Sequence, residues 1–251
     1  MPPAVLSEFA PRIPSPQGVF ESISGNYRPV KMPRGNLHCM TTVRQTGAND
    51  LASADVASDV QGRKAERLME IAGILDGAYG RRTWSSHGSP LEELVATVLS
   101  QHTSDLNTAR SYASLRRAFP TWEEVVSAPT HLVADAIRCG GLANIEAPRI
   151  QQILRDIRDK TGLYDLACLV EMPMDEARSW LMNLRGVGPK TAACVLLFSL
   201  GLPAMPVDTH VFRVGQRLGL IDKDVPPESA HAFFEAGLAH DRDAIYSSHL
   251  N

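Results

Sequence analysis

The sequence predicts an all-α fold. From about residue 61 onward, apolar residues recur at helical spacing, and no stretch alternates convincingly between apolar and polar residues as a half-buried strand does. Two segments begin with helix-capping signals, Ser89-Pro90-Leu91-Glu92 and Thr121-Trp122-Glu123-Glu124. The helices are short and separated by glycine and proline turns, and no repeat period stands out. These features favour a compact helical bundle over a solenoid.

The expected helices follow one another along the chain. The first begins near residue 61, with apolar residues at helical spacing at Leu68, Ile71, Ile74 and Leu75, and the second starts at the serine cap before Pro90. The others are expected at about 104–119, 121–127, 130–138, 145–161, 174–183, 189–200, 209–218 and 227–239. Residues 1–60 lack this periodicity and are rich in proline near the N-terminus, so we expect them to form a disordered extension.

Composition limits the classes of protein to which the chain can belong. It has 251 residues, of which 44% are hydrophobic and 21% charged, as in an ordinary globular protein. No apolar run approaches the roughly 20 residues that cross a bilayer, and the N-terminus lacks the pattern of a secretory signal. We therefore expect a cytoplasmic protein, nucleoid-associated in a prokaryote, with no membrane partner. The four cysteines show no Cys-x-x-Cys spacing, so no metal site is expected.

Net charge alone does not identify a nucleic-acid partner, because the formal charge is −3. The charge is unevenly distributed, however. Residues 181–220 carry four basic residues against one acidic residue, a local charge of +3, whereas residues 221–251 carry six acidic against two basic residues, a local charge of −4. A basic face with an acidic back is compatible with DNA binding.

The most informative stretch is Leu184-Arg185-Gly186-Val187-Gly188-Pro189-Lys190-Thr191-Ala192, which is followed by Val207-Asp208-Thr209-His210. Apolar patterns on both sides predict helices, so the glycines form a tight turn between them. Gly186 and Gly188 can adopt positive φ at low cost and let another backbone come close. Amide groups at such a turn, beside the positive end of the next helix, form an anion site. The stretch therefore predicts a helix–turn–helix that can hold a phosphate.

This turn, with its lysine and the later aspartate, resembles the endonuclease III family of DNA glycosylases, whose shared motif is a helix–hairpin–helix with a Gly/Pro loop and an aspartate. Three further stretches support the resemblance, 99–105, 140–150 and 206–214, and it covers about residues 61–251. It implies a two-lobed helical fold. One lobe is a six-helix, barrel-like domain of residues 81–202 that ends in the helix–hairpin–helix (174–200), and the other comprises residues 61–80 and 203–251.

The resemblance also implies a reaction. A monomeric enzyme would bind double-stranded DNA that contains a damaged base, such as an oxidised pyrimidine, or an abasic site. Lys190 would displace the base from the sugar, hold the sugar as a Schiff base and allow the β-elimination that nicks the strand. Because an unperturbed lysine is almost fully protonated at neutral pH, we expect the site to lower the pKa of Lys190. Asp208, at a helix start, would either stabilise positive charge on the sugar or take a proton from Lys190.

The resemblance implies DNA contacts as well. The target base lies inside a duplex and must be flipped out, and Gln101 would fill the gap and bond the orphaned base. His102, beside it, would contact DNA or cap the turn. The backbone amides of Gly186, Val187 and Gly188 would hold a phosphate. Further phosphate contacts are expected from Arg185, Thr191, His210 and Arg213, each of which has a solvent-facing alternative.

The chain departs from the family at its C-terminus. Family members end with four cysteines, spaced Cys-x6-Cys-x2-Cys-x5-Cys, that hold a [4Fe–4S] cluster, and this chain has none of them. We therefore expect a fragment truncated before the cluster motif, with no cofactor of its own and a cluster only if the full protein continues past Asn251. The second lobe would be incomplete, and Leu238, Ile245 and Leu250 would be exposed. Glu146 replaces a basic residue usual in the family, which puts one phosphate contact in doubt.

Two alternatives remain open. Monofunctional relatives, such as mismatch-specific adenine or thymine glycosylases, usually replace the hairpin lysine with Ser, Thr or Tyr. A non-catalytic helix–hairpin–helix DNA-binding module keeps the glycine turn but has no need of Asp208 at this distance. The combination of Lys190 and Asp208 therefore favours a DNA glycosylase with abasic-site lyase activity over both alternatives.

Overall fold

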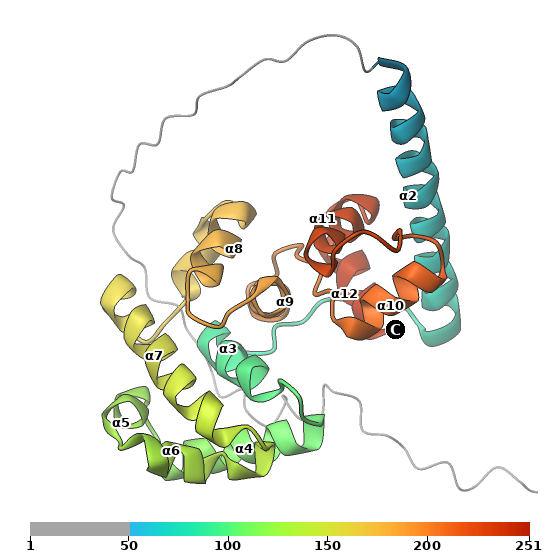
Figure 1. Cartoon of the computed structure of the whole chain (residues 1–251). Coiled ribbons are helices and arrows are strands. Elements are labelled where there is room, and N and C mark those ends of the chain that lie inside the picture. The colour runs from blue at the N-terminus through green and yellow to red at the C-terminus, as the bar shows by residue number, and fades with distance from the viewer. Residues whose placement is uncertain (1–50) are drawn as a thin grey trace, which may run out of the picture.

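The computed structural model describes the backbone of residues 51–251 and the side chains of residues 60–251, and every regular element in this range is helical (Figure 1). The α-helices are α2 (Leu51–Tyr79), α3 (Pro90–Leu99), α4 (Asp105–Ala118), α5 (Trp122–Ser127), α6 (Thr130–Ala136), α7 (Ala143–Thr161), α8 (Met174–Met182), α9 (Pro189–Cys194), α10 (Thr209–Arg217), α11 (Pro227–Gly237) and α12 (Arg242–Leu250). Two 3₁₀ turns, η1 (Arg138–Gly140) and η2 (Ala167–Glu171), and one π-helical turn, η3 (Val195–Ser199), complete the set. The all-α prediction is confirmed.

Side-chain caps explain several of the helix starts. The Thr121 hydroxyl accepts a hydrogen bond from the Glu124 amide at 3.2 Å, which fixes the start of α5 as the capping signal predicts. The Ser104 side chain caps α4 in the same way. Ser89 occupies the N-cap position of α3, but its side chain makes no cap bond, so this helix begins on Pro90 without the expected serine cap.

The first described helix begins earlier than the sequence analysis placed it. Residues 51–60 belong to α2, whereas they were expected to end a disordered extension over residues 1–60. This decapeptide contains three alanines and neither proline nor glycine, so nothing in it interrupts a helix. The remainder of the expected extension, residues 1–50, lies outside the described residues.

Buried apolar side chains form two clusters. One cluster contains residues of α3 to α9, among them Leu94, Ile150 and Leu184. The other contains residues of α2, η3 and α10 to α12, among them Phe234 and Ile245. In Figure 1, α3 to α7 lie on one side of the molecule and α2 with α10 to α12 on the other, with α9 between them.

The two clusters meet where an α-helix changes to a π-helical turn. A single α-helix was expected over residues 189–200, but α9 ends at Cys194 and continues as the π turn η3. The Leu200 amide accordingly donates to the Val195 carbonyl, five residues back, at 3.3 Å. Within η3, Val195 belongs to the first cluster and Phe198 to the second, so one turn serves both cores.

The C-terminal helices are covered by the first described helix. Leu238 and Ile245 are 1% and 0% exposed, so the expectation that they would be exposed was wrong, and Leu250 is half-buried. The reason is that α2 packs against both α11 and α12. The contact is close, because a Cβ on Gly237 would lie 2.8 Å from Cδ2 of Leu68.

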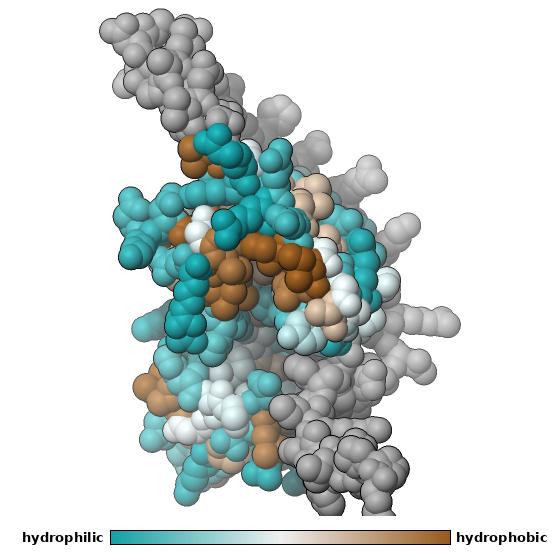
Figure 2. All heavy atoms as spheres, turned by 90° about the vertical axis from the view of Figure 1, so that its right-hand side faces the viewer, coloured by the Kyte–Doolittle hydropathy of each residue, from teal (hydrophilic) through white to brown (hydrophobic). Residues whose placement is uncertain are grey.

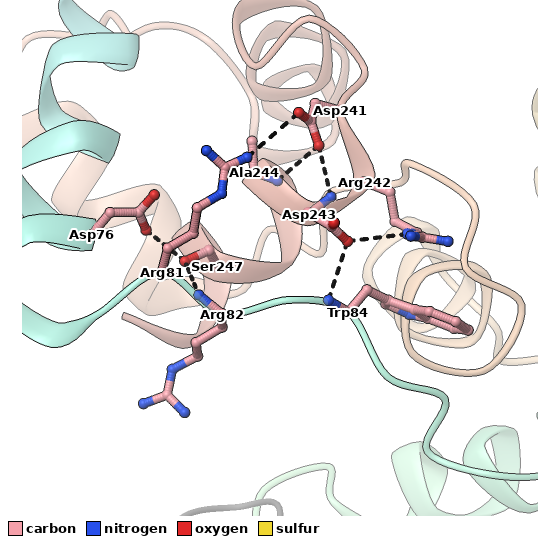
Figure 3. Close-up of polar contacts among 9 residues, drawn as sticks. All are labelled: Asp76, Arg81, Arg82, Trp84, Asp241, Arg242, Asp243, Ala244 and Ser247. Atoms are coloured by element: carbon pink, nitrogen blue, oxygen red, sulfur yellow. Dashed lines mark hydrogen bonds and ion pairs between the residues drawn. The ribbon is translucent and has the colours of Figure 1, made fainter.

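The segment between α2 and α3 is fastened to α12 by hydrogen bonds (Figure 3). The Arg82 amide donates to Oγ of Ser247 at 3.0 Å, and that hydroxyl donates to Oδ1 of Asp76 at 2.6 Å. Two residues on, the Trp84 amide donates to Oδ1 of Asp243 at 3.1 Å. These bonds fix the path of the chain as it crosses from one side of the molecule to α3.

The outer face of the second cluster is largely hydrophilic. Figure 2 views the side of the molecule that carries α2 and shows polar side chains over much of it, with apolar side chains near the middle and in smaller groups elsewhere. A groove on α2 is lined by Arg63, Glu66, Arg67, Glu70, Ile71, Ile74 and Leu218. Within residues 51–251, no helix is long and apolar enough to cross a membrane.

Candidate active site

The predicted hairpin is formed by α8, α9 and the turn between them. Gly186 has φ +83°, a conformation that favours glycine, and a Cβ at this position would lie 2.8 Å from both Cδ and Nε of Arg149, so that side chain would have to move. Gly188 has an ordinary φ of −96° with no atom within 4 Å of a Cβ position, so it does not use the freedom expected of it. The Val187 side chain is 5% exposed and anchors the turn in the first cluster.

Lys190 and Asp208 line one cavity of about 370 Å³, as the reaction implied by the sequence requires. Lys190 lies in the first turn of α9, and Asp208 precedes α10. The cavity is lined by His87, Glu93, Ala96, Thr97, Ser100, Asp105, Thr108, Ala109, Tyr112, Lys190, Cys194, Phe198, Asp208, His249 and Leu250. It therefore lies where α3, α4, α9 and α12 meet, and both clusters contribute to its wall.

Asp208 is held by backbone amides. Its Oδ1 accepts hydrogen bonds from the amides of His210 and Val211, each at 2.8 Å, so the residue is the N-cap of α10. One carboxylate oxygen is thereby committed to the helix, and the orientation of the other is fixed. In the structure the cap places the carboxylate at the cavity.

The expected lowering of the pKa of Lys190 does not occur. Its pKa is raised above the usual value by Cys194 first, and by Asp208 and Glu93, against the opposing effect of burial. Burial in turn raises the pKa of the Cys194 thiol to about 11, so this thiol is protonated at neutral pH. The expectation considered only a dry pocket and a helix start, whereas Cys194 on α9 itself, together with Asp208 and Glu93 from other elements, favours the ammonium form. Lys190 is therefore an ammonium ion before any reaction and has to lose a proton.

Glu93 is a cavity residue that the sequence analysis did not identify. It lies on α3, is 6% exposed, and burial raises the pKa of its carboxyl to about 7, with Thr97 and Lys190 acting in the opposite direction. The sequence signal that could have identified Glu93 is a carboxylate among the apolar residues of a buried helix. The flanking serine and proline instead suggested an ordinary helix start, in which glutamates are common.

Aromatic and imidazole rings form the part of the wall nearest the second cluster. The His87 ring stacks on Phe198 at 4.8 Å, and its Nε2 lies 3.2 Å from the hydroxyl of Tyr246. The His249 ring lies 5.4 Å from Phe198, and burial lowers the pKa of His249 to about 4, so this imidazole is neutral at physiological pH. This wall offers ring faces and an uncharged imidazole to whatever enters the cavity.

The predicted DNA-contacting residues lie in three places. Gln101 and His102 lie in the loop between α3 and α4, where His102 is exposed and has a left-handed φ of +62°. Arg185 is exposed in the hairpin turn. His210 and Arg213 are exposed on α10, where Nη2 of Arg213 lies 3.3 Å from Nδ1 of His210. Thr191 differs from these residues, because it is buried, with only 5% of its surface exposed.

Arg149 connects two of these places. Its Nη1 donates to Oε1 of Gln101 at 2.8 Å, and its Cδ and Nε lie over Gly186. The loop that carries Gln101 and the hairpin turn are therefore neighbours, although they are far apart in sequence. The same bond occupies the side-chain oxygen of Gln101, whose predicted role as a wedge remains a prediction.

The described residues do not fit a metal ion or an iron–sulfur cluster. No group of three or more His, Cys, Asp or Glu side chains among them is arranged to hold a metal. Their cysteines lie apart, with Cys139 exposed, Cys168 half-buried and Cys194 buried in the cavity wall.

Comparisons with known proteins agree with this geometry. Residues 95–239 match the model of the HhH-GPD superfamily base excision DNA repair protein. A candidate DNA glycosylase of Arabidopsis thaliana is 42% identical over 135 residues, which are 54% of this chain and 46% of the plant protein. The endonuclease III of Thermotoga maritima is 34% identical over 143 residues, 57% of this chain and 63% of that protein. The chain thus spans about half to two thirds of the length of these two relatives.

A solved structure extends the likeness to three dimensions. A non-covalent endonuclease III–DNA complex aligns with 72% of this chain and 85% of its own, at a TM-score of 0.57 and 27% sequence identity. The predicted two-lobed helical fold with a helix–hairpin–helix is therefore confirmed.

Proposed function

The chain belongs to the HhH-GPD superfamily of base excision DNA repair proteins, and from this premise we propose that it is a DNA glycosylase with abasic-site lyase activity. Its substrate would be duplex DNA that carries an oxidised pyrimidine or an abasic site. The observation that carries the proposal is the meeting of Lys190 and Asp208 in one cavity beside the hairpin turn. Lys190 lies in the first turn of α9 and Asp208 is the N-cap of α10, so each helix fixes the position of its side chain.

The chemistry assigned to this pair is nucleophilic. Neutral Lys190 attacks the anomeric carbon of the sugar, and the bond to the base breaks with its electron pair leaving on the base. The sugar ring then opens to a protonated imine on Lys190. The imine makes the neighbouring carbon acidic, so loss of a proton there expels the 3′ phosphate and nicks the strand. Asp208, whose carboxylate is fixed at the cavity, stabilises the positive charge that develops on the sugar.

The same proposal assigns DNA contacts to the surface around the cavity. The amides of Gly186 and Gly188 are proposed to hold a phosphate, whereas the Val187 amide, expected to join them, donates to the Leu184 carbonyl at 3.1 Å. Exposed Arg185, His210 and Arg213 add positive or hydrogen-bonding groups nearby in the sequence. The loop at Gln101 and His102 is proposed to enter the gap left by the flipped base. The neighbouring hairpin and loop support this arrangement, because Arg149 contacts both.

Lys190 also favours the lyase over a monofunctional glycosylase. A monofunctional enzyme activates water and needs no amine at the sugar, whereas here the amine is 18 residues before the capping aspartate and shares its cavity. A plain DNA-binding module would not need a cavity of about 370 Å³ lined by Lys190, Asp208 and Glu93.

A borohydride trapping experiment tests the proposal. The protein is incubated with a duplex that contains one abasic site or one thymine glycol, and sodium borohydride reduces any imine to a stable amine. We expect a covalent protein–DNA adduct with the wild type and none with Lys190→Ala. A folded, DNA-binding wild type that gives no adduct with either duplex would refute the lyase assignment.

The matched control is Lys160→Ala, a change of a lysine outside the cavity on α7, where its ammonium lies over the Trp180 ring. This variant should form the adduct as the wild type does. Base release without an adduct, measured by alkaline cleavage of the abasic product, would instead indicate the monofunctional alternative.

A further inference from the structure

Glu93 is a buried carboxylate that the proposed reaction has not yet used. It is 6% exposed on a helix whose other buried residues are mostly apolar. Its Oε1 accepts a hydrogen bond from the Thr97 hydroxyl at 3.2 Å, whereas Oε2 is buried without a hydrogen-bond partner. An ionised carboxylate in such a place is costly, and a buried polar atom left without a partner calls for an explanation.

The position of Glu93 supplies that explanation. It lines the same cavity as Lys190, from α3, which packs against α9. The other titratable groups around this cavity are His87 before α3, Asp105 and Tyr112 on α4, Lys190 and Cys194 on α9, Asp208 before α10 and His249 on α12. Nδ1 of His87 lies 3.9 Å from Oε2 of Glu93, but burial lowers the pKa of His87 and so favours its neutral form.

Lys190 is the one basic side chain of lysine or arginine type among the residues that line this cavity. Its pKa is raised, so it reaches the reaction as an ammonium ion and needs a proton acceptor. Asp208 has one oxygen committed to two amide hydrogen bonds of α10. Glu93 has an oxygen that no hydrogen bond occupies, on a residue that is only 6% exposed.

Resting on the proposed function, we propose that Glu93 is the proton carrier of the site, which takes a proton from the Lys190 ammonium and gives it to the departing base. In the first step an N–H bond of Lys190 breaks and an O–H bond forms on Glu93, leaving a neutral amine and a neutral carboxylic acid. In the second step the amine attacks the anomeric carbon as the bond to the base breaks. The proton on Glu93 then passes to the departing base, which leaves neutral, and Glu93 is ionised again.

This assignment separates the roles of the two carboxylates. Glu93 moves a proton, and Asp208, whose Oδ1 is held by two amides of α10, balances positive charge on the sugar. The assignment also accounts for the burial of Glu93 in the cavity wall, because burial raises the pKa of its carboxyl to about 7. A group with this pKa accepts and donates protons readily at neutral pH.

The test compares base excision with trapping on abasic DNA. Glu93→Gln keeps the shape of the side chain and an oxygen for Thr97, but it cannot carry a proton. We expect single-turnover excision of thymine glycol to fall by about 10²-fold or more. Borohydride trapping on preformed abasic DNA should fall less, because that reaction omits the transfer of a proton to a departing base.

The pH profile gives a second readout that a merely structural role would not move. Glu93 must be ionised to accept the proton, so wild-type excision should rise with pH through about 7, and this rise should be absent in Glu93→Gln. Formate added to Glu93→Ala should restore part of the excision rate, since it can occupy the vacated space and carry a proton. Glu92→Gln, on the same helix but not lining the cavity, should behave as the wild type.

The possible outcomes separate this inference from the proposed function. If Lys190-dependent trapping occurs but Glu93→Gln excises thymine glycol at the wild-type rate and with the wild-type pH profile, the proton-carrier role is overturned and the lyase stands. Equal losses of excision and trapping, together with a lower melting temperature, would also overturn it in favour of a structural role. If the wild type neither excises nor traps, the proposed function and the inference that rests on it both fail.

Discussion

Glu146 on α7 shows how strongly the protein interior acts on a single carboxyl group. It is 1% exposed, both of its carboxylate oxygens are buried without a hydrogen-bond partner, and burial raises its pKa to about 7 against the opposing effect of Arg149. The sequence analysis considered this position as a lost phosphate contact. Its burial means instead that the side chain does not reach the surface where DNA would lie.

A pH-dependent stability follows from this residue. The folded-state pKa lies above that of the unfolded chain, so the wild type loses stability as pH rises from about 4.5 to 7. Glu146→Gln removes the charge and should raise the free energy of unfolding at pH 8 by roughly 1–3 kcal/mol, with little effect at pH 4. Urea unfolding at both pH values measures the difference. If Glu146→Gln raised the free energy of unfolding by the same amount at pH 4 and pH 8, the raised pKa of Glu146 would not be the cause.

The proposed catalytic pair, Lys190 and Asp208, shows what single residues in the sequence can and cannot reveal. Lys190 and Asp208 were identified because a glycine turn and a helix start give recognisable local patterns. The direction of the pKa shift of Lys190 was predicted wrongly, because Cys194, one turn further along α9, and Asp208 and Glu93, which packing brings to the cavity, raise this pKa. Glu93 itself was missed for the same reason. A buried carboxylate differs from an exposed one only after its helix has been packed against another.

At the scale of elements, the hairpin turn depends on one glycine more than on the other. Gly186→Ala places a side chain at φ +83° and against the Arg149 side chain, so we expect a loss of about 1–3 kcal/mol in stability and weaker DNA binding. Gly188→Ala has an ordinary φ and open space, and its melting temperature should stay close to that of the wild type. Thermal melting of both variants checks the contrast. Equal destabilisation would show that φ is not the cause.

The helices themselves were largely predictable, and the exceptions have physical reasons. Most helix positions agree with the sequence because apolar spacing and caps such as Thr121 are local signals. The π turn after Cys194 was not predicted, because its extra residue is stabilised by the two cores on either side of it rather than by its own sequence. Likewise, the burial of Leu238 and Ile245 depends on α2, which is distant in sequence.

At the scale of the whole molecule, a buried ion pair joins the two clusters. Nη2 of Arg178 on α8 lies 2.7 and 2.9 Å from the two carboxylate oxygens of Glu235 on α11, and their side chains are 16% and 4% exposed. Oε1 of Glu235 also accepts the Met205 amide at 2.9 Å. The pair therefore fixes the relative position of the two sides that enclose the cavity.

Removing one member of this pair should be more harmful than removing both. Arg178→Met leaves Glu235 charged and unpaired, and we expect a loss of about 3–5 kcal/mol in the free energy of unfolding. The double variant Arg178→Met/Glu235→Gln should recover much of that loss. Lys64→Met, which removes the more exposed ion pair with Asp222, should cost about 1 kcal/mol or less. Denaturant titrations would contradict this account if the single and double variants were equally destabilised.

The packing of α2 against α11 and α12 has a consequence for synthesis on the ribosome. The first cluster is built from a continuous part of the chain, so its helices can assemble as they emerge. About 150 residues separate the end of α2 from the start of α11, and at roughly 5–20 residues per second their synthesis takes roughly 8–30 s. Throughout this interval Leu68 and Ile71 lack their native partners on α11 and α12. The wall of the cavity that carries His249 is therefore the last part of the site to form.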